Sequence, residues 1–243
     1  MIKLIAAITM IIDHAGIILF PDLKILRTIG RIAMPLYGYC IARGFYYSEL
    51  KNTTIKKYVR NILIFAVISQ IPYSYVALKY FKVFWLNIGF VWLFSIIILK
   101  ALQYIKLPLN KNGLISIVIV IVVVIASTKI PIEYYLYGVL TPIIFYFCLY
   151  KYKSYLTCIL LFAALNLEYL INECLEKKIH LRFMFEISDQ YYSLIAILIV
   201  LILKNIDKKL LPKKFFYWFY PAQFIFLVLI SLICETFNIS LSL

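Results

Sequence analysis

The chain has 243 residues, of which 65% are hydrophobic and 15% are charged, and its formal net charge is +14 at pH 7. This composition excludes a soluble globular domain and predicts a polytopic membrane protein. The positive charge does not indicate a nucleic-acid partner, because the lysines and arginines lie mostly in short loops between apolar segments, where such residues set membrane topology.

Nine apolar segments follow one another along the chain, and they predict an all-α transmembrane bundle of about nine spans. No internal repeat or linker divides the chain, so we expect one integral-membrane domain over residues 1–243. The expected segments are 2–20, 31–48, 58–78, 84–104, 113–128, 133–150, 154–171, 189–204 and 214–235.

The distribution of positive charge predicts the orientation of this bundle. Fifteen of the 25 lysines and arginines lie near the N-terminus or in loops after even-numbered segments, and eight lie in loops after odd-numbered segments. By the positive-inside rule, the N-terminus is cytoplasmic and, with nine spans, the C-terminus lies outside. The longest outer loop, about 172–188, is expected to be a solvated loop.

The first segment carries Asp13 and His14 past its middle. Lys3 and His14 are separated by roughly 16 Å of helix rise, which places this pair near the midplane of a bilayer or beyond it. An ionisable group there costs about 2.5–3.5 kcal/mol on insertion scales. The pair is therefore either a functional site or a set of polar contacts between helices.

Further polar residues lie in later segments. Arg31 opens the second segment at its outer side, and Arg43 lies near its cytoplasmic end, beside Gly44. Each can be a snorkelling arginine, but a guanidinium at a cytoplasmic mouth also suits an anionic phosphate. The others are Gln70, Asn87, Tyr220 and Gln223.

Any one of these polar groups can be a helix–helix contact. Taken together, they predict a polar cavity between the first, second, third and ninth segments. The five cysteines are scattered without metal-ligand spacing, so we expect no metal site. No Ser/His/Asp elbow, P-loop, GxGxxG or HExxH pattern is present. With these patterns excluded, the sequence predicts a buried base, His14, and a separate cationic group, Arg43, near the cytoplasmic end.

The polar positions also form a pattern that resembles the TraX-type membrane acetyltransferases, which are named for acetylation of the conjugative pilin N-terminus. The matching motifs are Lys3-Leu-Ile-Ala, Met10, Asp13-His14, Gly16, Leu26-Arg27-x-Ile-Gly30-Arg31-Ile-Ala33-x-Pro35, Gly44-Phe45, Tyr58-x-Arg60, Ser69-Gln70-Ile-Pro72-Tyr73, Leu86-Asn87, Tyr137-Gly138, Gln190 and Phe219-Tyr220-Pro221. The Asp-His and Ser-Gln-x-Pro stretches are the most specific, and residues 105–185 match only loosely.

This resemblance implies a protein of the bacterial inner membrane that transfers an acetyl group from acetyl-CoA to an amine, such as the N-terminus of a peptide or pilin-like protein. It also implies kinship with the wider transmembrane acyltransferases. His14 is then the general base or transient acyl carrier, and Asp13 its orienting or electrostatic partner. Arg31, Gln70 and Asn87 shape the pocket. One departure is Gln223, which stands where we expect a histidine.

The mechanism expected from these assignments needs no metal. Acetyl-CoA binds from the cytoplasm, with Arg43 and loop lysines at its anionic end. His14 takes a proton from the attacking amine or first accepts the acetyl group, and Gln70 or Asn87 donates a hydrogen bond to the developing oxyanion. The acceptor arrives from the membrane lipids or the outer side.

Two alternatives remain open. O-acetylation of a lipid or surface glycan uses the same donor and base. A proton-coupled transporter of small solutes would use Asp13 and His14 as a proton relay and the arginines as an anion path, although nine segments divide poorly into two repeats.

Overall fold

A computed structural model describes residues 1–50, 55–105, 111–176, 189–206 and 215–237, together with residues 208, 210 and 212. Over these residues the secondary structure is helical apart from one isolated bridge, which confirms the predicted all-α class. The elements are α1 (Ile2–Ile18), α2 (Lys24–Gly30), α3 (Ala33–Leu50), α4 (Ile55–Val76), the π-helix η1 (Ala77–Phe81), α5 (Ile88–Leu102), α6 (Lys111–Lys129), α7 (Tyr135–Phe145), the π-helix η2 (Tyr146–Lys151), α8 (Tyr155–Glu176), the 3₁₀ helix η4 (Asp189–Leu194), α10 (Ile195–Leu203) and α11 (Phe215–Thr236).

Each of the nine predicted segments forms a helix over most of its length. Three helices are long and apolar enough to cross a membrane, namely Ile55–Phe81, Asn112–Lys129 and Phe215–Thr236. These three indicate a membrane protein, and the total of nine spans stays a prediction. Most of the expected outer loop 172–188 lies outside the described residues, but α8 extends to Glu176.

Two segment starts differ from the sequence-based expectation. Residues 24–30, expected as a loop, form the short helix α2, so Arg31 lies in the turn between α2 and α3 and does not open a span. The fourth segment was expected to start at residue 84 but becomes helical only at Ile88, where Asn87 caps α5 by accepting a 2.8 Å hydrogen bond from the Gly89 N–H. Capping residues of this kind satisfy the free N–H groups of a first helical turn.

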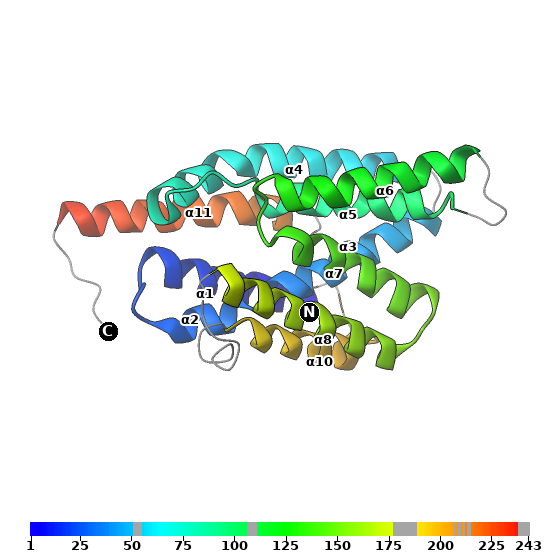
Figure 1. The fold of residues 1–243 in the computed structure, drawn as a ribbon. Coiled ribbons are helices and arrows are strands. Elements are labelled where there is room, and N and C mark those ends of the chain that lie inside the picture. Colours follow the sequence, from blue (N-terminus) through cyan, green and yellow to red (C-terminus); the bar gives the residue numbers. More distant parts are fainter. Residues whose placement is uncertain are drawn as a thin grey trace.

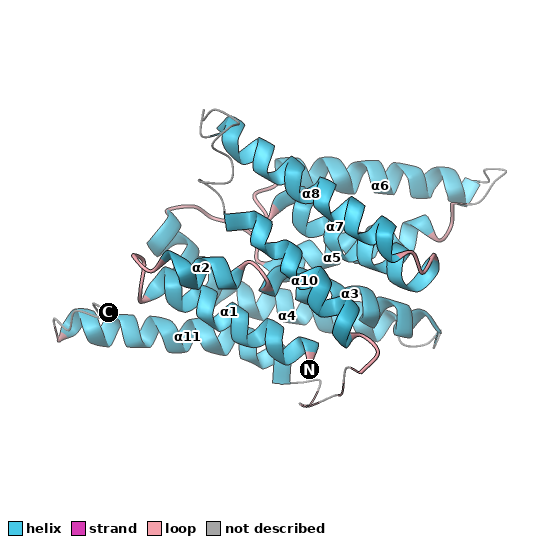
Figure 2. Cartoon of the chain, turned by 90° about the horizontal axis from the view of Figure 1, so that it is seen from below, coloured by secondary structure: helices cyan, strands magenta, loops and turns pink. Residues whose placement is uncertain are grey.

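The helices form a bundle in which α1 and α11, from the two ends of the chain, lie side by side (Figures 1 and 2). α1 also packs against α2 and α3, α3 packs against α7, and α5 lies among α4, α6 and α7. The last turns of α11 extend past the rest of the bundle in both views. Large buried side chains such as Leu36, Phe45 and Phe145 fill the interior.

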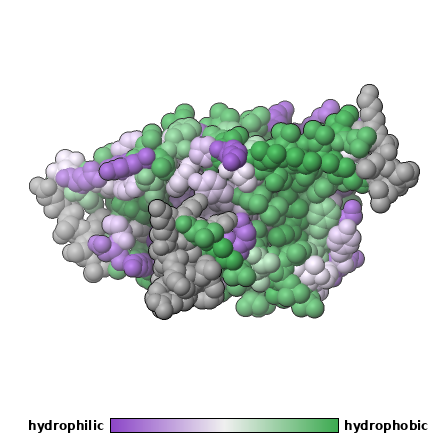
Figure 3. Space-filling view, viewed as in Figure 1, coloured by the Kyte–Doolittle hydropathy of each residue, from purple (hydrophilic) through white to green (hydrophobic). Residues whose placement is uncertain are grey.

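The outer surface is apolar where a soluble protein would be polar. Only 17% of the apolar stretch Asn112–Lys129 of α6 is buried inside the bundle, and Leu114, Val118 and Val122 are exposed. Figure 3 shows a broad hydrophobic surface over the region of α6 and α7. Such a surface on a helical bundle fits contact with lipid tails.

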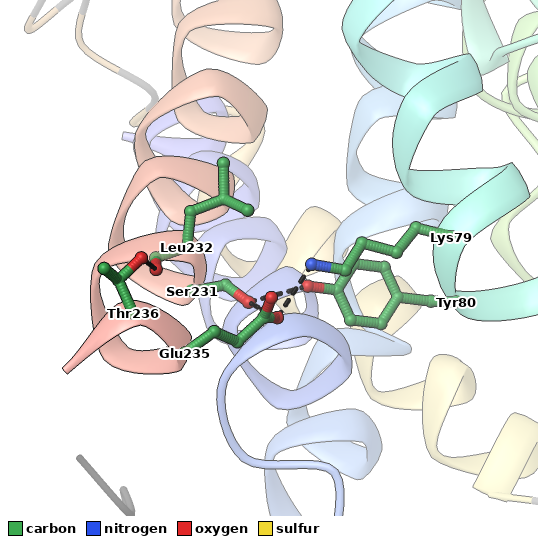
Figure 4. A network of polar contacts seen from close by, with 6 residues as sticks. All are labelled: Lys79, Tyr80, Ser231, Leu232, Glu235 and Thr236. Atoms are coloured by element: carbon green, nitrogen blue, oxygen red, sulfur yellow. Dashed lines mark hydrogen bonds and ion pairs between the residues drawn. The ribbon is translucent and has the colours of Figure 1, made fainter. Parts of the chain in front are cut away.

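The free end of α11 is fastened to the end of the α4–η1 helix by a polar network (Figure 4). Lys79 Nζ lies 2.7 Å from Glu235 Oε1, which also accepts a 3.0 Å hydrogen bond from Ser231 Oγ. Tyr80 OH lies 3.0 Å from the same serine oxygen. The network holds the C-terminal end of α11 against η1.

Candidate functional site

The imidazole of His14 lies almost fully buried in a cradle made by one face of α11. Its ring stacks on Phe224 with a centroid distance of 4.3 Å, and Tyr220 meets it edge-on at 6.1 Å. Gln223 Nε2 lies 2.9 Å from His14 Nδ1. Tyr220, Gln223 and Phe224 occupy positions i, i+3 and i+4 of a helix, so one face presents all three to the histidine.

The contact with Gln223 links the protonation of one imidazole nitrogen to the orientation of an amide. With Nε2 of Gln223 donating, Nδ1 of His14 accepts and its proton resides on the ring Nε2. Turning the amide by 180° presents Oε1 instead, which accepts from an Nδ1–H and frees the ring Nε2 as a base. Gln223 therefore selects whether His14 acts as a hydrogen-bond donor or as a proton acceptor.

Asp13 faces a different neighbour. Its Oδ1 lies 2.8 Å from Arg27 Nη1 of α2, and the aspartate side chain is 9% exposed against 25% for the arginine. Successive residues on a helix are about 100° apart, so Asp13 and His14 turn toward α2 and α11 respectively. The orienting contact expected from Asp13 is thus made by Gln223, while an electrostatic role for Asp13 stays a prediction.

Gly30 makes room for this carboxylate. A Cβ atom built at Gly30 would overlap the Asp13 side chain, including Oδ1. Only a residue without a side chain lets the end of α2 approach α1 this closely. The Gly-Arg pair quoted from the sequence motif is therefore part of the site: Gly30 admits Asp13, and Arg31 follows in the turn.

A second acid, Glu133, lies in the link between α6 and α7 and joins this charged cluster. The charges of Asp13, Arg27 and Arg31 all act on its carboxyl group, which also accepts a hydrogen bond from the Ile88 N–H. Glu133 is absent from the site residues predicted from the sequence, and Arg27 is present there only as part of a motif. The available signal for Glu133 was an acid at the start of the sixth predicted segment, 133–150, because acids are rare in membrane-spanning segments.

Several polar atoms of the cluster are buried and make no hydrogen bond to the described part of the chain. They are Arg31 Nε, Glu133 Oε2, Tyr220 OH and Gln223 Oε1. Buried polar groups are nearly always satisfied in proteins, and leaving one unpaired costs about 1–3 kcal/mol. Two donors, Arg31 Nε and Tyr220 OH, and two acceptors, Glu133 Oε2 and Gln223 Oε1, are thus available to a polar ligand.

Gln70 and Asn87 have a different environment from the one expected. Gln70 Oε1 accepts from the Asn87 N–H at 2.9 Å, and its Nε2 donates to Trp85 O and to Ser74 Oγ, each at 2.8 Å. Asn87 Nδ2 donates to Ala66 O at 2.7 Å. Both amides tie α4 to the start of α5, so donation by Gln70 to an oxyanion would require one of its present bonds to break. The oxyanion role stays a prediction.

Arg43 is separated from the charged cluster. It lies on α3 twelve residues beyond Arg31, roughly 18 Å along a helix, with its guanidinium 5.9 Å from the ring centroid of Tyr47. A small pocket at the same end is lined by Phe45, Ser48, Glu49, Ile55, Lys100 and Gln103. The structure therefore separates the predicted cytoplasmic mouth from the predicted base, and CoA binding by Arg43 stays a prediction.

The family described as TraX protein matches residues 1–231, which is nearly the whole chain. The chain belongs to the TraX family. This confirms the TraX family that was predicted from the Asp-His and Ser-Gln-x-Pro motifs.

Curated relatives of this TraX-family chain match it over shorter stretches. An uncharacterised protein of Rickettsia prowazekii (strain Madrid E) is 40% identical over 81 residues, which are 33% of this chain and 29% of the relative. A Dichelobacter nodosus protein named "Probable fimbrial assembly protein FimC, serogroup H1" is 33% identical over 78 residues, 30% of each chain. The matches thus span less than a third of each relative's length, and no solved structure matches.

Proposed function

We propose that this TraX-family protein is a membrane-embedded acetyltransferase that moves an acetyl group from cytoplasmic acetyl-CoA to an acceptor amine, the N-terminus of a peptide or pilin-like protein. The observation that carries the proposal is the buried imidazole of His14, held at Nδ1 by Gln223 and flanked by the Asp13–Arg27 ion pair. The Dichelobacter relative, whose name refers to fimbrial assembly, supports a pilin-like acceptor.

The chemistry at His14 follows from its surroundings. The imidazole takes a proton as the amine nitrogen attacks the thioester carbonyl, the C–N bond forms, and the C–S bond breaks. His14 then returns its proton to the leaving thiolate of CoA. An alternative route in which the imidazole first carries the acetyl group uses the ring Nε2 as well, and both routes require Gln223 to present its Oε1 to the Nδ1–H of His14.

The hydroxyl of Tyr220 and the Nε–H of Arg31 are the donors best suited to the oxyanion, because both are buried and unpaired within the described residues. In the proposed orientation the protein lies in the bacterial inner membrane with a cytoplasmic N-terminus. Acetyl-CoA then enters from the end that carries Arg43, and the acceptor amine enters from the outer end beside Arg31.

The test uses purified protein in lipid nanodiscs, labelled acetyl-CoA, and a peptide acceptor with a free N-terminus. We expect wild type to transfer label, His14→Ala to bind acetyl-CoA without transfer, and His180→Ala, the other histidine variant, to behave as wild type. Label on a serine-containing peptide with a blocked N-terminus would instead assign an O-acetyltransferase. Absence of both binding and transfer in wild type would refute the proposal.

The buried pairing of acids and arginines also favours a second candidate, a proton-coupled transporter, because such residues mark proton relays in membranes. Proteoliposomes separate the two functions. A transporter acidifies its lumen with a solute gradient in the absence of acetyl-CoA, whereas the acetyltransferase consumes the thioester without a gradient.

A further inference from the structure

The position of Glu133 is fixed by backbone contacts between two links of the chain. The Leu86 N–H donates to Pro131 O at 2.8 Å, and the Glu133 N–H donates to Leu86 O at 3.0 Å. The α6–α7 link is thereby held against the start of α5, and the next residue, Tyr134, adopts a left-handed backbone with φ of 61°. Glu133 is thus presented to the site by a fixed segment of backbone.

Charged and titratable groups surround Glu133 on each side. Asp13 of α1, Arg27 of α2 and Arg31 of the following turn act on its carboxylate. The phenol groups that face it are Tyr134 of the same link, Tyr73 of α4 and Tyr220 of α11. The charges of the two acids and the two arginines sum to zero when all four groups are ionised.

The two acids differ in what they can still accept. Asp13 already forms its 2.8 Å ion pair with Arg27. Glu133 uses one side of its carboxyl group for the Ile88 N–H, and its Oε2 is buried without a hydrogen-bond partner among the described residues. Asp13 Oδ1 is thus held in an ion pair, whereas Glu133 Oε2 has neither an ion pair nor a hydrogen bond among the described residues.

The proposed reaction needs such an atom. A peptide N-terminus arrives largely as an ammonium ion, because its pKa is about 8. It must lose one proton before its nitrogen can attack and a second as the amide forms. His14 returns the proton that it takes to the thiolate, so a different group has to accept the other one.

We propose, on the basis of the proposed function, that Glu133 binds the ammonium group of the substrate amine through Oε2 and is the first group to take a proton from it. The carboxylate takes one proton and becomes a neutral acid, and the ammonium becomes the free amine. The amine then attacks the thioester while His14 takes its second proton and passes it to the CoA thiolate. Glu133 releases its proton to the outer aqueous phase, so each turnover produces amide, CoA–SH and one proton.

The physical reason for this transfer is burial. An ammonium and a carboxylate in a low-dielectric site each lose hydration, and moving one proton converts the ion pair into two neutral groups. Before the substrate enters, Asp13 forms its ion pair with Arg27, and Arg31 and Glu133 lie in the same charged cluster. The substrate class that follows is a primary amine that is protonated in water.

The test compares wild type with Glu133→Gln, whose amide oxygen still accepts from the Ile88 N–H. With a peptide acceptor, we expect the variant to transfer about tenfold more slowly at pH 7 and about a hundredfold more slowly at pH 6, because the free amine falls tenfold per pH unit below its pKa. The two rates should converge above about pH 8.5. The matched control Asp22→Asn, an exposed acid in the turn between α1 and α2, should keep the wild-type pH profile.

A second acceptor separates proton transfer from structure. An aromatic amine is neutral at pH 6, so Glu133→Gln should acetylate it at the wild-type rate. Equal losses with both acceptors at every pH, or no loss at all, would overturn the assignment while leaving the acetyltransferase proposal intact. If Glu133→Gln does not fold, Glu133→Asp replaces it and must retain the wild-type pH profile. A transfer rate of Glu133→Asp that falls tenfold per pH unit, in step with the concentration of free amine, would overturn the assignment. A wild type that transfers to neither acceptor removes the proposed function and this inference together.

Discussion

Replacing Gln223 by leucine should remove the positioning of His14 while preserving the volume of the side chain. The variant leaves the Nδ1 atom of His14 buried and without its 2.9 Å partner. An unsatisfied buried polar group costs about 1–3 kcal/mol. If that cost falls on the transition state, kcat drops roughly 5- to 150-fold. KM for acetyl-CoA should not change, because Gln223 lies in the cluster around His14 and far from Arg43.

The assay is the initial rate of acetyl transfer in nanodiscs, measured over a range of acetyl-CoA concentrations. Gln223→Glu is the informative companion, because a carboxylate can only accept from Nδ1–H and so fixes the tautomer in which the ring Nε2 is a base. We expect this variant to retain activity. A Gln223→Leu protein with wild-type kcat, or a Gln223→Glu protein as slow as the leucine variant, would refute the positioning of His14 by this contact.

Three further predictions concern the surroundings of the site. Gly30→Ala should lower the thermal unfolding temperature and abolish transfer, because the new methyl group overlaps the Asp13 side chain. Ala33→Gly, at the start of α3, is the control for backbone flexibility. A Gly30→Ala protein as stable as wild type would contradict the close packing of Gly30 on Asp13. Asn87→Ala should destabilise the protein by at least about 0.5–2 kcal/mol, measured by denaturant unfolding, because it loses the α5 cap and also the hydrogen bond to Ala66 O. Asn87→Asp keeps the capping oxygen but sets a buried carboxylate against Ala66 O, so it should not restore the wild-type stability. Arg43→Met should raise KM for acetyl-CoA about tenfold, equivalent to about 1.4 kcal/mol, with kcat unchanged, and an unchanged KM would remove Arg43 from the donor site.

The all-α class and the helical segments could be predicted from sequence because bilayer thickness imposes long apolar runs. His14 could also be found, since an imidazole deep in such a run demands an explanation. Its partner could not be derived in the same way. Hydropathy does not specify which two of the predicted helices touch, and the pairing of α1 with α11 joins residues 209 positions apart.

The remaining differences arise from short-range structure that hydropathy does not register. Arg31 was expected inside a span, but α2 places it in a turn over the site. Asn87 and Gln70 were expected to face a substrate, yet helix capping and backbone contacts engage their amides. Glu133 escaped notice because its place in the cluster depends on the docking of two links, which only the folded chain brings together.

The contact between His14 and Gln223 also sets an order for biogenesis. As the first of the nine predicted segments, α1 is expected to bring Asp13 and His14 to the membrane long before the ninth segment is made. At roughly 5–20 residues per second, synthesis of the intervening chain takes about 10–40 s. During that interval α2 can already provide Arg27 to Asp13, but no part of α11 exists to receive His14. Assembly of the reactive centre is therefore a late event, and chains that stop before α11 should be inserted but inactive.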